Sequence, residues 1–222
     1  ASSFGFKNRI INGDMRISQY NGTSSTTATN NVYPIDRFVF KGSQSSKFSV
    51  QQLSASPPTG FNTYLGLTVS STATVGSGDY FAIGQRIEGY NIQDLGLGTS
   101  NNKPFTISFW VYSSLTGTFG ASITSGGSDA SYGFNYTISN ANTWTFVSQT
   151  IPGTSSGTWN SNSTNTGMQL FFGLGVGSTY AAAPGSWGSV NAFGASGSVN
   201  VVGTSGATFY ITGVQLEAGS QA

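Results

Sequence analysis

The sequence predicts an all-β fold, an antiparallel jelly-roll β-sandwich of about ten strands, and three observations support this prediction. Apolar residues recur with a period of two over short segments, as half-buried strands require. Gly, at 31 of 222 residues, combines with Ser, Thr and Asn to separate these segments with turn residues. No segment of comparable length shows the helical period, although residues 91–95 could form one turn. A single sandwich domain often reaches this length.

The first part of the chain differs from the rest in its charge. More than half of the charged residues lie within residues 7–47, and residues 21–31 form a Ser/Thr/Asn tract that is typical of a loop. We therefore divide the chain into an N-terminal arm and loop, residues 1–33, and a jelly-roll β-sandwich domain, residues 34–222.

The N-terminal arm has two interpretations. Residues 6–19 mix apolar and charged side chains, so this segment either meets another subunit or forms an ordinary first strand on its own sheet. In the first case, its apolar side chains form an oligomer interface. They are Ile10, Ile11, Met15 and Ile17.

From residue 34 onward, the alternating segments are short and regularly interrupted by Gly, Ser and Asn. This spacing favours a sandwich over a parallel sheet with helical crossovers. The expected strands are residues 36–41, 47–53, 64–71, 80–88, 105–113, 118–124, 132–139, 144–151, 168–176 and 207–216.

The strand expected at residues 105–113 has two unlike faces. One alternating set, which begins at Phe105 and includes Phe109, is wholly apolar and is expected to face the core. The opposite set carries Trp110 and Tyr112 among Thr and Ser. This second face suits either a half-covered groove or contact with another surface.

The last expected strand changes its apolar phase. Before Gly213 the apolar residues are Phe209 and Ile211, whereas after it they are Val214 and Leu216. One extra residue would produce this slip. We therefore predict a β-bulge at Gly213 and the residue before it.

The composition excludes most catalytic chemistry. The chain has no His or Cys, and its charged residues amount to 7% against roughly a quarter in ordinary domains. General acid–base catalysis, nucleophilic triads and zinc sites therefore lack their usual side chains, so we expect no catalytic residue, no metal and no cofactor. The seven acidic residues show no paired spacing for glycoside hydrolysis. Asp79 and Asp129 lie in Gly/Ser turns, where a turn-capping role is favoured over calcium binding.

Two classes of partner are also disfavoured. With a net charge of +1 and only eight Lys and Arg residues, the chain cannot neutralise many phosphates, so no nucleic-acid partner is expected. It contains no apolar run of about 18 residues, so no membrane insertion is expected.

Aromatic residues in polar loops give the strongest binding signal. Trp159, Tyr180 and Trp187 lie among Gly, Ser, Thr and Asn. A large aromatic face in such a loop often stacks on a ligand, and sugar rings fit such faces. The alternative is that each ring folds back and plugs an end of the sandwich. The candidate carbohydrate-binding residues are Trp110, Tyr112, Trp159, Tyr180 and Trp187.

Several segments together resemble a known family. Residues 8–19, 36–38, 106–111, 144–152 and 209–220 are similar to the virion-surface proteins of tailed bacteriophages, of the type common in cyanophage and other marine-phage tail fibres. Their fold is shared with carbohydrate-binding jelly rolls. The resemblance implies a location on the virion surface, a homotrimer and contacts with other virion proteins.

The resemblance and the composition together favour a noncatalytic virion structural protein, a tail-fibre module that contacts host-surface polysaccharide. The alternative is a capsid-decoration or head-fibre protein that binds the viral shell. A glycan-degrading enzyme is the third and least favoured interpretation.

Overall fold

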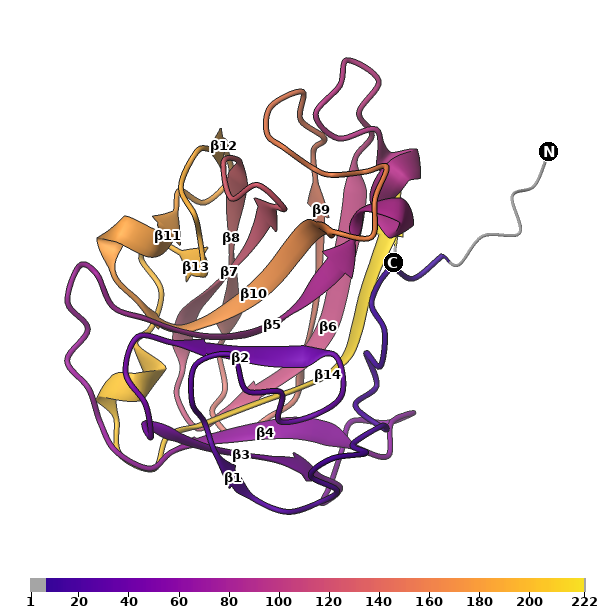
Figure 1. Ribbon diagram of the computed structural model, residues 1–222. Helices are drawn as coiled ribbons and strands as arrows, with labels where there is room; N and C mark the ends of the chain where they lie inside the picture. The colour runs from indigo at the N-terminus through magenta and orange to yellow at the C-terminus, as the bar shows by residue number, and fades with distance from the viewer. Residues whose placement is uncertain (1–6, 222) are drawn as a thin grey trace.

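The computed structural model describes residues 7–221 and contains two six-stranded antiparallel β-sheets that pack face to face (Figure 1). The predicted sandwich is therefore confirmed. Sheet A has the strand order β1-β3-β4-β14-β6-β9. Its strands are β1 (Thr26–Thr27), β3 (Phe48–Leu53), β4 (Tyr64–Val69), β6 (Phe105–Ser113), β9 (Thr145–Ile151) and β14 (Thr208–Ala218).

Sheet B has the strand order β12-β8-β7-β10-β5-β2. Two short strands, β11 (Ala181–Ala182) and β13 (Gly194–Ala195), form a parallel pair in the segment that lies against this sheet. Within residues 7–221, no helix is long and apolar enough to cross a membrane. The remaining elements are β2 (Phe38–Gly42), β5 (Tyr80–Glu88), β7 (Gly117–Ser125), β8 (Ser131–Ile138), β10 (Thr166–Val176), β12 (Trp187–Gly188), η1 (Gly89–Leu95), η2 (Ser178–Tyr180) and η3 (Val201–Gly203).

All the expected strands are present. The bounds of β5 and β6 are those predicted, and the helical turn expected at residues 91–95 lies within η1. The two-residue strands β1, β11, β12 and β13 were not predicted, because two residues are too few to show a period.

Phe109 of β6 joins the two sheets. Its ring contacts Phe172 of β10 at a centroid separation of 4.8 Å and Tyr136 of β8 at 5.1 Å, both edge to face. The apolar residues of β6 in the same phase as Phe109 are fully buried. Period-two alternation therefore directs the other phase of β6 to the outer face of sheet A.

The predicted β-bulge is confirmed at Gly213. The register of β14 against β6 shifts between Thr212 and Gln215, and Gly213 has a φ of 63°. Before the bulge β14 pairs with β4. Beyond it the N-terminal segment takes the place of β4: the Val214 N–H donates to the Gly13 carbonyl, and the Arg9 N–H donates to the Leu216 carbonyl.

The described part of the N-terminal arm packs against the same sandwich. The buried Gln85 side chain accepts a hydrogen bond from the Ile11 N–H and donates one to the Ile11 carbonyl, each at 2.8 Å. Gln52 donates to the Met15 carbonyl at 2.6 Å. Two buried glutamine side chains therefore satisfy backbone groups of a segment that belongs to neither sheet.

The four apolar residues of the arm divide into two pairs. Ile10 and Met15 are buried in the core of their own sandwich, so neither side chain is open to another subunit. Ile11 and Ile17 are 42% and 48% exposed. A subunit interface through Ile11 and Ile17 stays a prediction.

We expect Gly213→Ala to lower the free energy of unfolding by about 2 to 4 kcal/mol. An added Cβ would lie 2.6 Å from Phe61 Cζ and 3.2 Å from Trp110 Cδ1, at a φ that L-residues rarely adopt. Gly206→Ala is the control, since its φ of 71° is similar but its Cβ would meet no atom within 4 Å. It should cost only about 1 to 2 kcal/mol. Urea unfolding measures both, and equal losses would show that crowding at Gly213 contributes nothing.

Candidate functional site

The outer face of sheet A carries two neighbouring sets of aromatic side chains. Trp110 of β6 lies opposite Phe146 of β9, and Tyr112 of β6 lies opposite Tyr210 of β14. Because residues directly opposite each other point to the same face, these rings share the face that lies away from the core. We call this group the aromatic platform. Its members are Tyr64, Trp110, Tyr112, Trp144, Phe146 and Tyr210.

Four rings of the platform contact one another in a closed set. Tyr112 stacks on Tyr210 at 5.0 Å with an interplanar angle of 8°, and Tyr64 contacts Tyr210 at 5.2 Å. Trp144 contacts Tyr64 at 5.2 Å and Tyr112 at 5.5 Å. Each ring is therefore held in place by two others.

Hydrogen bonds fix the polar ends of these rings. The Tyr64 hydroxyl donates to the Ala55 carbonyl at 2.8 Å, and Trp144 Nε1 donates to the Ser56 carbonyl at 2.9 Å. Burial and the neighbouring tyrosines raise the pKa of Tyr64, which keeps its hydroxyl protonated at neutral pH. The rings are thus ordered before any ligand arrives.

Trp110 and Phe146 extend the platform along β6 and β9. Their ring centroids are 5.3 Å apart, and Phe146 is 51% exposed. Trp110 is half-buried, and both it and Phe61 lie against the bare Cα of Gly213. Ser148, exposed on β9, lies two residues from Phe146 on the same face. The platform therefore combines flat apolar surface with hydroxyl groups that can hydrogen-bond a polar ligand.

Trp159 and Trp187 lie elsewhere, at one end of the sandwich. Trp159 is 3% exposed, and its Nε1 donates to the Ser156 carbonyl at 2.8 Å. Trp187 is half-buried and meets Trp159 edge to face at 5.7 Å. The placement of Trp159 corresponds to the alternative interpretation, a ring that plugs the sandwich, and leaves its indole no open face.

Tyr180 lies on the outer face of sheet B. It contacts Tyr80 at 4.9 Å and Phe193 at 5.5 Å, within the segment that covers part of this sheet. The five candidate binding residues are therefore not brought into one site: Trp110 and Tyr112 share the outer face of sheet A, Trp159 contacts Trp187, and Tyr180 lies apart from both pairs. A role for Tyr180 or Trp187 in ligand binding stays a prediction.

Sequence reasoning missed most of the platform. The signal for these rings was present in the outward phase of the other strands of sheet A, but using it required knowing which strands are neighbours. The missed residues are Tyr64, Trp144, Phe146 and Tyr210.

The turn-capping role predicted for Asp129 is visible in its contacts. Its carboxylate accepts hydrogen bonds from Ser125 Oγ at 2.7 Å, from the Thr158 N–H at 2.8 Å and from Thr158 Oγ1 at 2.7 Å. These hydrogen bonds, led by that from Ser125, lower the pKa of Asp129 from 3.8 to about 2. Asp79 is held in a similar way by Ser43, Gln44 and the Gly76 N–H, which lower its pKa.

The acidic residues do not gather into a metal site. In the described part of the chain, no group of three or more acidic side chains could hold a metal ion. Three acids instead form ion pairs, Asp94 with Arg9, Asp14 with Arg16 and Glu88 with Arg37.

No protein-family model and no curated protein matches this chain. Solved structures do resemble it. A candidate sugar-binding protein from Bacteroides thetaiotaomicron superposes with a TM-score of 0.54 and 12% identity, over 96% of this chain and 100% of the other. At this identity the likeness is one of fold. The chain is thus an all-β, two-sheet antiparallel jelly roll that shares its fold with that candidate sugar-binding protein.

Two further structures are less similar in shape. A family 61 carbohydrate-binding module solved with β-1,4-galactotriose has a TM-score of 0.47 and 10% identity, over 96% of this chain and 100% of the module. The enzymatically active domain of tailspike protein 4 from bacteriophage CBA120 has a TM-score of 0.49 and 14% identity, over 95% of this chain. This chain spans 21% of that tailspike chain.

Trp159→Ala should cost about 3 to 5 kcal/mol of stability, because it leaves a cavity among buried side chains. Phe146→Ala, which truncates a ring that is 51% exposed, should cost less than about 1 kcal/mol. Chemical unfolding of the two variants measures the difference. Similar losses would show that Trp159 is not a structural plug.

Asp129→Asn should destabilise the protein at neutral pH but not in strong acid. The pKa of Asp129 is about 2 in the folded state, against 3.8 for the free group. Its carboxylate therefore contributes fully to the free energy of unfolding above pH 3.8, and this contribution is lost as the pH falls toward 2. Urea unfolding at neutral pH and in stepwise more acidic buffers measures the difference in stability between Asp129→Asn and wild type, which should shrink as the pH falls. Glu217→Gln, which removes a carboxylate that makes no ion pair in residues 7–221, is the control for the loss of one negative charge. A gap between Asp129→Asn and wild type that stays constant into acid would contradict the prediction.

Proposed function

We propose that this protein is a noncatalytic module of a phage virion, in a tail fibre, which binds host-surface glycan through the aromatic platform. The observation that carries the proposal is the set of aromatic rings, fixed by their neighbours and partly open to solvent, on the outer face of sheet A. The phage context rests on the sequence resemblance.

The chemistry of the platform suits sugar rings. A sugar presents an apolar C–H face that stacks on Tyr or Trp, and its hydroxyls can exchange hydrogen bonds with nearby Ser and Thr. No charge is needed for such contacts, and the whole chain carries little. Because the platform is ordered in the free protein, little conformational entropy is lost on binding.

The acidic residues support a noncatalytic role. Glycoside hydrolysis generally needs two carboxylates that flank the scissile bond. One cavity is lined by Glu88, another by Glu217 and a third by Asp14, each with a single acid. Glu88 is also paired with Arg37.

A homotrimer on the virion surface is part of the proposal. Exposed apolar side chains of the N-terminal segment, Ile11 and Ile17, supply a surface for contact with a second copy or with another virion protein. Antibody labelling of intact particles, viewed by electron microscopy, distinguishes a fibre from the alternative, a capsid-decoration or head-fibre protein bound to the shell.

We predict that Trp110→Ala and Tyr112→Ala each weaken binding of host polysaccharide by about 1 to 3 kcal/mol, as loss of a central contact does. Tyr90→Ala is the matched control, since Tyr90 is 56% exposed and lies in η1, away from the platform. Binding is measured by calorimetry against polysaccharide purified from the host.

Light scattering on the same variants identifies the competing explanation. If a platform variant converts an oligomer to a monomer and leaves polysaccharide binding unchanged, the platform is a subunit interface and the proposed site is wrong. Equal weakening by Tyr90→Ala would also contradict the proposal, because the effect would then not belong to the platform.

A further inference from the structure

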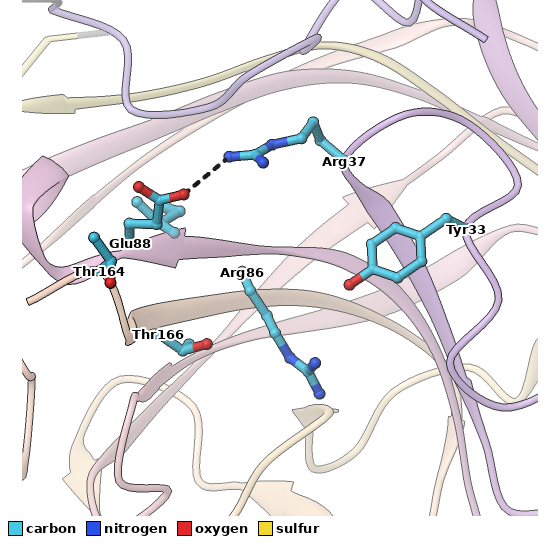
Figure 2. Close-up of a pocket in the computed structure, with 7 residues that line it drawn as sticks. Tyr33, Arg37, Arg86, Glu88, Thr164 and Thr166 are labelled. Atoms are coloured by element: carbon cyan, nitrogen blue, oxygen red, sulfur yellow. Dashed lines mark ion pairs between the residues drawn. The ribbon is translucent and has the colours of Figure 1, made fainter. Parts of the chain in front are cut away.

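A second surface feature lies on sheet B, on the opposite side of the sandwich from the platform. It is a cavity of about 250 Å³ at the end of β5, bordered by the start of β10 and by residues that precede β2. Figure 2 shows its polar lining side chains, with the Tyr33 hydroxyl directed toward the space between the two arginines. They are Tyr33, Arg37, Arg86, Glu88, Thr164 and Thr166.

The cavity contains a cation without a counter-charge. The Arg86 guanidinium makes no hydrogen bond or ion pair with any residue in 7–221. In Figure 2 it extends away from the only acid of the cavity, Glu88. Glu88 pairs instead with Arg37, at 3.6 Å. With two arginines and one glutamate, the lining therefore has a net charge of +1.

A further cation, Lys41, lies outside the lining of the cavity but on the same sheet. Lys41 of β2 lies opposite Ala82 of β5, and Arg86 lies four residues further along β5, so both side chains leave the same outer face of sheet B. Lys41 is only 9% exposed; its Nζ donates to the neutral Asn31 Oδ1 at 2.8 Å and lies 5.7 Å from the centre of the Phe193 ring. Burial, and then the charge of Arg86, lower the pKa of Lys41.

Within residues 7–221, most of the cations make no ion pair, but Arg86 is the one of these that lines this cavity. The chain has eight Lys and Arg residues. Arg9, Arg16 and Arg37 each form an ion pair with a carboxylate, whereas Arg86 forms none within residues 7–221. An anion bound beside Arg86 would supply the counter-charge that the lining of the cavity lacks.

We propose that this cavity binds the anionic group of an acidic sugar residue, a carboxylated or sulfated one. The Arg86 guanidinium has the planar pair of donors that matches a carboxylate or sulfate, and Lys41 adds long-range attraction. Tyr33, which is 46% exposed, offers a ring face and a hydroxyl, while Thr164 and Thr166 offer hydroxyls to the sugar. The volume lies just below the roughly 300 to 1,000 Å³ of drug-sized ligand pockets, which suits one sugar residue. The site is separate from the platform and does not depend on it.

The test is calorimetric titration of the full chain with three tetrasaccharides of similar length, one of galacturonate, one of sulfated galactose and one of neutral galactose. Wild type should bind at least one acidic probe, and Arg86→Ala should weaken that binding at least tenfold. Arg86→Lys should recover only part of the loss, because Lys keeps the charge but not the paired donors. Comparison of the two acidic probes identifies whether the group is carboxylate or sulfate.

Lys47→Ala is the matched control, since it removes one positive charge from the opposite sheet, at the residue before β3. It should leave the binding of the acidic probes unchanged. Arg86 is exposed, so Arg86→Ala should keep the melting temperature of wild type. Equal weakening by Lys47→Ala and Arg86→Ala would overturn the inference, and so would failure of wild type to bind either acidic probe at millimolar concentration. Trp110→Ala should not alter this binding, so the two proposed sites can fail independently.

Discussion

The alternation of side chains along β6, anchored by Phe109, determines what both faces of sheet A can do. Phe109 reaches across the sandwich to Phe172 and Tyr136, so its phase must face the core. Trp110 and Tyr112 must then point outward, whatever their own preference for burial. A shift of one residue in register would bury both rings and expose Phe109. The core contact and the exposed platform are therefore two results of one constraint.

The sequence was sufficient for the fold but only in part for the site. Alternation and turn residues predicted the ten longer strands, because both signals are local. The slip in phase around Gly213 likewise predicted the bulge. Which strands are neighbours is not local information. For this reason Trp110 and Tyr112 could be placed on an outer face, whereas Tyr210 and Phe146 could not be placed beside them.

The burial of the tryptophans in loops likewise could not be predicted from their neighbours in sequence. A ring among Gly, Ser and Asn can turn outward to a ligand or inward to the core, and its neighbours in sequence are the same in both cases. For Trp159 the deciding contacts come from distant residues such as Trp187. The predicted N-terminal arm had a similar ambiguity, since Gln85 and Gln52, which hold it against the sandwich, lie far along the chain.

The pairing of residues 9–13 with the end of β14 has a consequence for how the protein can be built into a larger one. Because the first and last described segments run side by side, the two ends of the described chain lie next to each other. Such a module can interrupt a loop of a host protein without forcing the two flanking strands apart. By the same reasoning, a short linker could connect residues 8 and 220, and new termini could open in an exposed turn such as that at Gly60. Circular permutation should therefore leave both sheets intact.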